Sequence, residues 1–199
     1  MRAIRTVGHG TLAAGDFVDL MRNAGLEVVI DVRRFPGSRR SPHFGTKEMK
    51  RWLSARDIDY HWLDSLGGRR QPTSDSPNVG LRNPQFRAYA DHMASPEFAD
   101  GVAQLETLAR ARPAAIMCAE AVWWRCHRRL LADHLTLVSA ERVEHLFHDG
   151  RLVRHPMTPP ARRAGGHVVY DRVDVNPISA GGTSNAGSSS SGAFDEAST

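Results

Sequence analysis

Chemically reactive side chains stand at the ends of several apolar segments of this sequence. His9 ends the first segment, Asp31 lies at the end of the second, and Cys118 and Glu120 follow a later one. A carboxylate or an imidazole can transfer a proton, and a thiolate can attack an electrophile. One candidate mechanism uses Asp31 and Glu120 as an acid–base pair. The other uses Cys118 as a nucleophile, with His127 or His9 as its base.

Basic residues are concentrated in one part of a chain whose formal net charge is only +4. Residues 33–70 contain ten Lys or Arg but only four Asp or Glu. Arginine binds phosphate or carboxylate through two parallel hydrogen bonds, and glycines let backbone amides approach an anion closely. The sequence therefore predicts a pocket for an anionic ligand. The expected anion-binding residues are Arg33, Arg39, Arg40, His43, Gly67, Gly68, Arg69, Arg70, Arg125 and Arg128.

Two adjacent tryptophans, Trp123 and Trp124, follow the cysteine segment. If exposed beside arginines, they would stack on a nucleotide base or a single-stranded nucleic acid; if buried, they are core residues. The two cysteines, Cys118 and Cys126, are too few for a disulfide framework. With neighbouring Glu and His residues they offer ligands to a metal ion, but their spacing matches no structural zinc pattern. We therefore expect no cofactor, with a metal site as the less favoured alternative.

Two alternating periodicities organise residues 1–155. Apolar runs predict strands at residues 3–9, 26–32, 58–63, 113–119 and 142–150. Helical spacing predicts helices at residues 16–25, 47–57, 83–93, 95–110 and 125–137, the second capped by Thr46 and the fourth by Ser95. The alternation predicts a single α/β domain with a mainly parallel sheet and helices on both faces. Ligands bind such sheets at the carboxyl ends of the strands, where the reactive residues fall.

The composition changes after His155. Residues 156–199 are rich in Pro, Gly and Ser, and we expect them to form a largely disordered tail. Within that tail, residues 168–173 have the character of an edge strand or a short docking motif. No run of eighteen apolar residues predicts a transmembrane helix, and the N-terminus lacks the apolar core of a signal peptide. We expect a cytoplasmic protein that does not bind membranes.

The order strand, cysteine, loop, arginine, helix resembles the active-site loop of rhodaneses and of dual-specificity phosphatases. The segment IDVR at residues 30–33 also resembles the rhodanese strand that precedes that loop. A thiol that faces a helix N-terminus beside arginines has a lowered pKa. Six residues separate Cys118 from Arg125, whereas those loops usually hold four or five. The alternative is a small buried cysteine at the end of a strand.

Five ordered motifs resemble the bacterial and archaeal family called domain of unknown function 488. They are TVGHGT, DVRRFPGSRRSPHF, LGGRR, NPQFRAYADHM and MCAEAVWWRCHRRLLADHL, and they span roughly residues 4–150. The resemblance implies a compact α/β domain and no established reaction. The positions that match the motifs are His9, Asp31, Arg33, Pro36, Arg39, Arg40, His43, Phe44, Gly67, Gly68, Arg69, Arg70, Cys118, Glu120, Cys126, His127 and Arg128.

These observations favour an enzyme, a hydrolase or transferase, with an arginine-rich pocket for an anionic small molecule, a nucleotide or a nucleic acid. Its chemistry would be carboxylate acid–base catalysis or attack by a thiolate, the latter as in a rhodanese or phosphatase. The alternative is a non-catalytic module that binds a nucleotide or nucleic acid with the same residues. A catalytic site loses turnover on a single substitution, whereas a binding module loses affinity gradually and depends steeply on salt.

Overall fold

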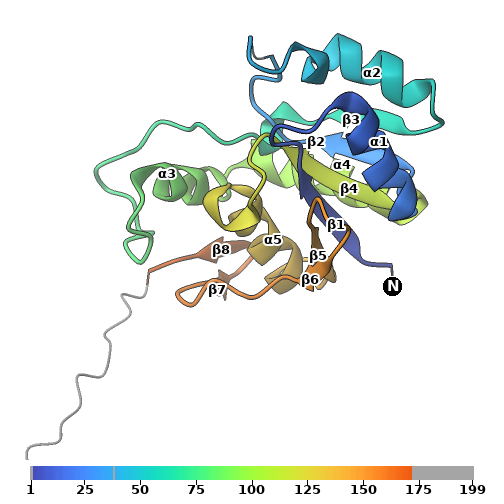
Figure 1. Ribbon diagram of the computed structural model, residues 1–199. Coiled ribbons are helices and arrows are strands. Elements are labelled where there is room, and N and C mark those ends of the chain that lie inside the picture. The colour runs from blue at the N-terminus through green and yellow to red at the C-terminus, as the bar shows by residue number, and fades with distance from the viewer. Residues whose placement is uncertain (1, 38, 172–199) are drawn as a thin grey trace, which may run out of the picture.

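The computed structural model describes residues 2–37 and 39–171, and a six-stranded sheet forms its centre (Figure 1). The strands are β1 (Ile4–Gly8), β2 (Val28–Asp31), β3 (Asp59–Trp62), β4 (Ala114–Cys118), β5 (Val143–Leu146) and β6 (Leu152–Arg154). They lie in the order β3-β2-β4-β1-β5-β6. Strands β1 to β5 are parallel, and β6 is antiparallel to β5. The prediction of a mainly parallel sheet is confirmed.

Helices cover both faces of this sheet. Helices α1 (Ala14–Asn23) and α2 (Thr46–Ser54) pack on one face, where Phe17 and Met49 join an apolar cluster with Val29 of β2. Helices α4 (Pro96–Ala111) and α5 (Arg128–Leu137) pack on the other face, where Phe98 joins a second cluster with Ile30. Helix α3 (Pro84–His92) contacts α5. Because adjacent residues of a strand point to opposite faces, β2 contributes to both clusters.

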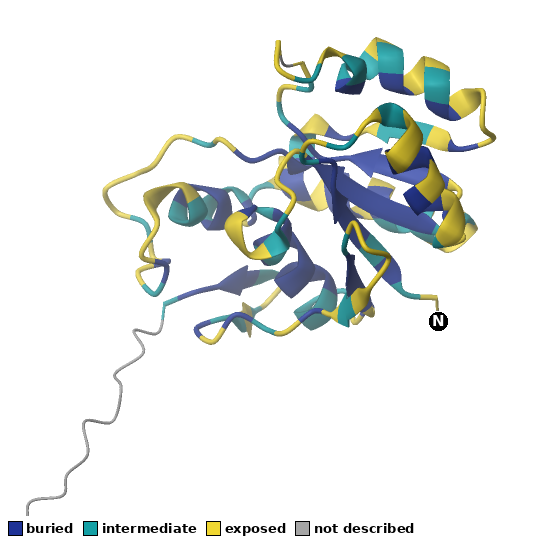
Figure 2. Cartoon of the chain, in the orientation of Figure 1, coloured by how far each residue is buried: buried dark blue, intermediate teal, exposed yellow. Residues whose placement is uncertain are grey.

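Burial decreases from the middle of the sheet to its β3 edge (Figure 2). Every residue of β2 and β4 is buried, as their continuous apolar runs predict for central parallel strands. Strand β3 lies at the edge, and each of its residues is partly or fully exposed. The centre of the sheet is therefore the rigid part of the fold, and residues at the ends of β2 and β4 are held firmly.

Local capping chemistry sets the start of several helices. Ser95 caps α4 by accepting a hydrogen bond from the Phe98 amide at 3.2 Å, as predicted. Asn83 caps α3 in the same way, accepting from the Gln85 amide at 2.8 Å. Thr46 was expected to cap α2, but it is the first helical residue, and Gly45 occupies the N-cap.

Three short 3-10 turns carry connections at the carboxyl edge: η1 (Pro42–Phe44), η2 (Asp64–Leu66) and η3 (Trp123–Arg125). The helix expected from residue 125 begins only at Arg128, because Cys126 has extended backbone angles. This shift places Cys126 ahead of α5 rather than inside it. The strand expected at residues 142–150 ends at Leu146, and the chain then turns and returns as β6.

The described fold continues beyond residue 155, where the sequence analysis ended the domain. Strands β7 (Arg162–Ala164) and β8 (His167–Val169) form a small hairpin apart from the main sheet, so residues 168 and 169 do not extend its edge. Val168 and Tyr170 are fully buried against α5. Asp133 of α5 accepts hydrogen bonds from the Thr158 amide and the Tyr170 hydroxyl. Residues 172–199, with the Ser/Gly-rich stretch, lie outside the described residues.

Candidate active site

A crevice is expected where the chain leaves neighbouring parallel strands toward opposite faces of a sheet. Strand β4 lies between β2 and β1. The chain leaves β1 and β2 toward α1 and α2 on one face, and it leaves β4 toward α5 on the other. Cys118 is the last residue of β4 and pairs in register with Gly8 of β1. The thiol therefore stands at this switch point.

A cavity of about 280 Å³ opens at the same edge. Seven of its lining residues are predicted site residues: Arg33, Gly68, Arg69, Cys118, Glu120, Arg125 and His127. The other seven are Arg34, Phe35, Gln85, Phe86, Tyr89, Ala119 and Cys126, of which the last was expected from the sequence as a metal-ligand candidate and a family-motif position, not as a catalytic residue. The aromatic members form an apolar wall, and the Tyr89 hydroxyl donates to the Leu66 carbonyl at 2.9 Å.

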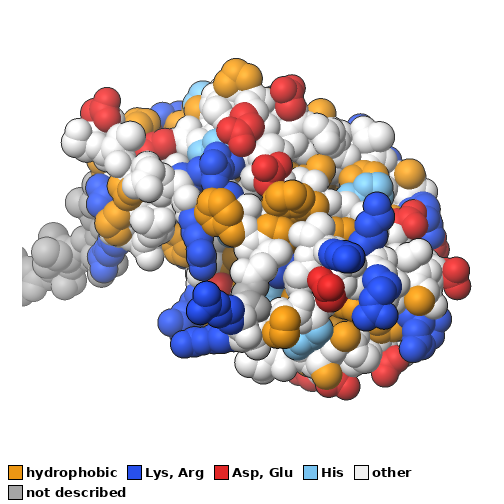
Figure 3. Space-filling model, turned by 90° about the horizontal axis from the view of Figure 1, so that it is seen from above, with side chains coloured by type: hydrophobic (Ala, Val, Ile, Leu, Met, Phe, Trp, Pro, Cys, Tyr) orange, Lys and Arg blue, Asp and Glu red, His pale blue; other side chains and the backbone are white. Residues whose placement is uncertain are grey.

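Three arginines at the cavity, Arg34, Arg69 and Arg125, have no carboxylate partner among residues 2–37 and 39–171. We call them the arginine rim. Arg34 lies over the ring of Phe35, with its Cζ atom 5.9 Å from the ring centroid. From above, groups of Lys and Arg side chains alternate with hydrophobic ones on the surface (Figure 3). The rim offers unneutralised positive charge to an anion.

Glycines at this edge allow close packing that no other residue permits. A Cβ atom on Gly68 would lie 2.9 Å from Nδ1 of His127, and one on Gly67 would lie 2.7 Å from the backbone of Arg34. The glycine pair therefore lets the loop after β3 press against both neighbouring segments. This packing positions His127 and Arg34 at the cavity, in addition to any contact of the glycines with a ligand.

Asp31 is fully buried, and protein groups occupy both of its carboxylate oxygens. Arg33 donates from Nε to Oδ1 at 2.9 Å and from Nη2 to Oδ2 at 2.6 Å. The Tyr60 hydroxyl also donates to Oδ2, at 2.7 Å. Burial and the Asp31 charge raise the pKa of Tyr60, so its hydroxyl remains a donor. The geometry favours a positioning role for Asp31 rather than proton transfer to a substrate.

His9 is likewise held by its surroundings. Its ring stacks on Phe44 with centroids 4.1 Å apart, Nδ1 lies 3.0 Å from the Gly10 carbonyl, and Nε2 lies 3.3 Å from Nη1 of Arg33. Burial and the Arg33 charge lower the pKa of His9 to about 4. A neutral imidazole that donates from Nδ1 satisfies both contacts, since Nε2 then accepts from the guanidinium.

A second cysteine, Cys126, lies directly beside Cys118. Sγ of Cys118 lies 2.7 Å from Sγ of Cys126, and both residues are buried beneath the cavity. Cys126 precedes α5, and the Arg128 amide points to its sulfur at 3.5 Å. His127 lies with Nδ1 3.5 Å from the same sulfur, while its Nε2 lies 3.0 Å from the Val32 carbonyl.

The two thiols differ in acidity. Burial and the hydrogen bond with Cys126 raise the pKa of Cys118 well above the ordinary thiol value. Burial opposes ionisation of Cys126 as well, but the hydrogen bond from Cys118 and the charges of His127 and Arg128 lower the pKa of Cys126 well below that value. Cys126 is therefore the more acidic of the two thiols and the better candidate for the nucleophile, whereas the sequence pattern pointed to Cys118.

Arg128 is a buried cation without a carboxylate partner in the described part of the chain. Its Nη2 donates to the Glu120 carbonyl at 2.5 Å, and its Nε has no hydrogen-bond partner there. A buried guanidinium normally requires a counterion. The Cys126 sulfur lies 3.5 Å from the backbone amide of the same arginine, and a thiolate at that position would supply the negative charge that the guanidinium lacks.

Other predicted residues lie away from the cavity. Arg39 and Arg40 are exposed on the loop before η1, and Nε2 of His43 lies 3.1 Å from the Leu12 carbonyl. Arg70 donates to backbone carbonyls and pairs with Glu97 at 3.4 Å. Trp123 stacks on His145 with centroids 4.1 Å apart, and Trp124 is 45% exposed beside Phe147. Neither tryptophan lines the cavity.

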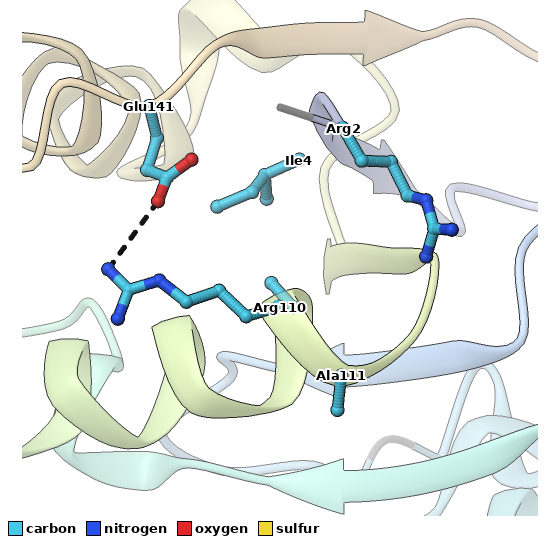
Figure 4. Close-up of a pocket in the computed structure, with 6 residues that line it drawn as sticks. Arg2, Ile4, Arg110, Ala111 and Glu141 are labelled. Carbon is cyan, nitrogen blue, oxygen red and sulfur yellow. Dashed lines mark ion pairs between the residues drawn. The ribbon is translucent and has the colours of Figure 1, made fainter.

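A second hollow, of about 380 Å³, lies at the opposite end of the strands (Figure 4). Arg2, Ile4, Glu141 and residues 109–111 line it. Arg110 there pairs with Glu141 at 3.6 Å, so the carboxylate is already neutralised. Among the described residues that line the hollow there is no thiol or imidazole, and the one carboxylate is paired with Arg110.

The described residues contain neither a metal-binding cluster nor a membrane-spanning helix. Within residues 2–37 and 39–171, no group of three or more His, Cys, Asp or Glu is arranged to hold a metal ion. In the same ranges, no helix has both the length and the apolar character needed to cross a membrane.

The fold and the cavity together define an α/β protein with a thiol pair at the switch point of a mainly parallel sheet. The chain belongs to the family described as Domain of unknown function DUF488, whose sequence model matches residues 13–135. That range exceeds half of the chain and contains every residue that lines the cavity. The family resemblance seen in the sequence is thereby confirmed. No curated protein and no solved structure matches the chain significantly.

Proposed function

We propose that this protein is an enzyme that binds a small anionic substrate at the arginine rim and attacks it with the Cys126 thiolate. The observation that carries the proposal is the hydrogen-bonded series Cys126, His127 and the Val32 carbonyl. When Nε2 of His127 donates to Val32, Nδ1 is left to take the thiol proton. A nucleophile, a base and a group that orients the base are the parts of an activated nucleophile.

Thiolate chemistry has stronger support than carboxylate chemistry. Asp31 is occupied by Arg33 and Tyr60, which leaves Glu120 as the single carboxylate that lines the cavity in the described ranges. A pair of carboxylates for acid–base catalysis is therefore lacking at the cavity. Glu120 remains suited to proton transfer with the bound substrate, because its residue is exposed at the opening.

A small anion fits the cavity better than a large ligand. Pockets for drug-sized ligands usually enclose ~300–1,000 Å³, and this cavity is about 280 Å³. The rim supplies three guanidinium groups for a carboxylate or phosphate, while the wall of Phe86 and Tyr89 suits an apolar portion of the substrate. The substrate class is thus a small molecule with a carboxylate or phosphate group.

A nucleotide or nucleic acid is the second candidate ligand, supported by Phe35. This side chain is 65% exposed and lies under Arg34 at the mouth of the cavity. An exposed ring next to a guanidinium is suited to base stacking while the arginine binds a phosphate. Binding of an oligonucleotide that weakens steeply with salt, with no turnover of any substrate, would favour this candidate.

The pH dependence of alkylation tests the nucleophile. Iodoacetamide modification of Cys126 and Cys118, read separately by peptide mass spectrometry, should show Cys126 reacting with a midpoint well below the free-thiol pKa of about 8.5. The His127→Gln variant should raise the Cys126 midpoint by about one pH unit or more, since a nearby cation is removed. His61→Gln, a change on strand β3 outside the cavity, is the control. An ordinary midpoint for Cys126 would overturn the proposal.

A charged reagent tests the arginine rim. Iodoacetate carries a carboxylate and iodoacetamide does not, so the ratio of their rates at Cys126 reports attraction of an anion. Arg125→Gln should lower that ratio by about fivefold, the effect of roughly 1 kcal/mol between two exposed charges. Arg22→Gln, on the exposed side of α1, should leave the ratio unchanged. Equal ratios in the wild type and Arg125→Gln would remove Arg125 from the binding site.

A further inference from the structure

The second thiol is not explained by a mechanism that uses Cys126 alone. The sulfur atoms of Cys118 and Cys126 are 2.7 Å apart at the bottom of one cavity. A disulfide requires a separation of ~2.05 Å, so a small adjustment of the two side chains joins them. The cysteines come from different elements, the end of β4 and the segment before α5. The fold brings them together across eight positions of sequence.

We propose that Cys118 is a resolving thiol, and that the site reduces the S–S bond of a small anionic disulfide by thiol–disulfide exchange. The inference rests on the proposed function, because it takes Cys126 as the nucleophile and the arginine rim as the binding site. It adds the class of substrate and the role of Cys118.

The reaction balances in two steps. The Cys126 thiolate attacks one sulfur of the substrate R–S–S–R; a Cys126–S–S–R bond forms, the substrate bond breaks, and R–S⁻ leaves. Cys118 then attacks Sγ of Cys126, the Cys118–Cys126 disulfide forms, and the second R–S⁻ leaves and takes the Cys118 proton. The substrate gains two electrons and the protein loses two. Two equivalents of an external thiol, or one external dithiol, then reduce the Cys118–Cys126 disulfide; the protein returns to the dithiol and the external thiol is oxidised to its own disulfide.

Arg128 affects the equilibrium between the dithiol and the disulfide forms of the protein. In the dithiol state the Cys126 thiolate lies near this buried guanidinium, whose Nε has no hydrogen-bond partner in the described residues. In the disulfide state that negative charge is gone, and the cation is left buried without a counterion. Loss of the counterion destabilises the disulfide relative to the dithiol. The oxidised protein is therefore readily reduced, as turnover requires.

The arginine rim favours substrate disulfides that carry negative charge. Arg34, Arg69 and Arg125 surround the entrance to the thiol pair, while Glu120 is the carboxylate among the described lining residues. A disulfide that carries carboxylates is attracted to this entrance, and one that carries amines is repelled. The compounds 3,3′-dithiodipropionate and cystamine share the central C–C–S–S–C–C unit but differ in the charge of their ends. They are a matched pair of probes.

The test follows both cysteines of the full chain by mass spectrometry after exposure to each probe. The wild type should form the internal Cys118–Cys126 disulfide and should keep no adduct of the probe on Cys126. It should react about tenfold or more faster with 3,3′-dithiodipropionate than with cystamine, as a rim of two or more exposed charges predicts. Cys118→Ser should retain a Cys126 adduct. Its release by added thiol should be at least about 100-fold slower than internal resolution, because proximity accelerates the intramolecular step.

Two results separate failure of this inference from failure of the proposed function. If Cys126 of the wild type keeps the adduct as long as the Cys118→Ser variant does, Cys118 is not a resolving thiol, although Cys126 remains the nucleophile. If Cys126→Ser reacts with the probes as fast as wild type, the proposed nucleophile is wrong as well. The wild-type peptide map needs no variant, so misfolding of a variant does not remove the test. Absence of the internal disulfide from that map overturns the inference.

Discussion

The carboxylate of Asp31 acts on the site through Arg33. It receives three side-chain donors and the Arg33 amide, and its own exposure is zero. Arg33 in turn donates to the Phe44 carbonyl at 2.7 Å and lines the cavity. The pair therefore connects the loop after β2 to η1, and it fixes the position of one residue that lines the cavity. Removing the carboxylate would leave Arg33 as a buried cation without its partner.

The Asp31→Asn variant should mainly lose stability, with a smaller effect on the reactivity of Cys126. Breaking a buried ion pair costs about 3–5 kcal/mol, so urea unfolding should show a loss of that size. Glu120→Gln is the matched control: its carboxylate is exposed at the same edge, and its effect should stay within about 0.5 kcal/mol. If Asp31→Asn retained full stability but abolished alkylation of Cys126, Asp31 would have a direct chemical role.

Residue types in the sequence pointed to half of the residues that line the cavity, but not to Cys126 as the nucleophile. The prediction begins the helix at residue 125, which places Cys126 within it and makes Cys118 the only thiol at a strand end. In the structure the backbone at Cys126 is extended, so this cysteine lies ahead of the helix and joins Cys118 at the cavity. The pairing of His127 with Val32, 95 positions away in sequence, sets its orientation, and no local pattern encodes that contact.

At the scale of elements, the segment after β4 crosses β1 in very close contact. A Cβ atom on Gly8 would lie 1.6 Å from the Glu120 carbonyl oxygen and 2.8 Å from Nη2 of Arg128. The same carbonyl accepts the hydrogen bond of Arg128, and the Gly10 amide donates to the Ala119 carbonyl at 3.0 Å. Gly8 therefore sets the path by which β4 continues toward Cys126.

Gly8→Ala should displace this crossing and both thiols with it. Overpacking costs about 1–3 kcal/mol and more where backbone blocks the new atom, so the thermal midpoint should fall and the rate of Cys126 alkylation should decrease. Gly15→Ala is the control, because nothing lies within 4 Å of its Cβ position in α1. That change should be neutral or stabilise by up to about 1 kcal/mol. Equal behaviour of the two variants would contradict the assigned role of Gly8.

Elements with a long, regular pattern are the ones that the sequence predicts well. The buried strands β2 and β4 follow from continuous apolar runs, and α4 follows from Ser95 and its apolar spacing. Strand β6 has three residues, of which Leu152 is 40% exposed, and so it carries too little pattern to predict. Its position depends on pairing with β5, which is a property of the folded chain.

At the scale of the whole molecule, a buried polar network joins the C-terminal segment to the sheet. Oδ1 of Asp133 lies 2.8 Å from Nε2 of His155, whose Nδ1 lies 2.9 Å from Nε2 of His145. Nδ1 of His145 lies 2.7 Å from the Thr6 hydroxyl of β1. The composition of residues 156–171 predicts a loose tail because the segment is rich in proline and glycine. In the structure the Thr158 amide and the Tyr170 hydroxyl hold this segment by hydrogen bonds to Asp133.

Buried histidines make the stability of the whole fold depend on pH. Burial lowers the pKa of His9 and His134 from 6.5 to about 4, and it lowers the pKa of His145 from 6.5 to about 3. The unfolded chain therefore binds more protons than the folded chain below pH 6.5. Stability is fully present above that pH and falls as the solution is acidified toward pH 4. The slope is ~1.4 kcal/mol per pH unit for each histidine once its unfolded form is protonated.

His134 allows this dependence to be measured one group at a time. Its Nδ1 has no hydrogen-bond partner among the described residues, and its ring packs edge-on against Phe98 at 5.0 Å, so His134→Phe keeps an aromatic ring and removes the titration. Urea unfolding between pH 6 and 4.5 should show a slope smaller than that of wild type by about 1.4 kcal/mol per pH unit. Parallel curves for wild type and His134→Phe would mean that His134 is protonated in the folded protein.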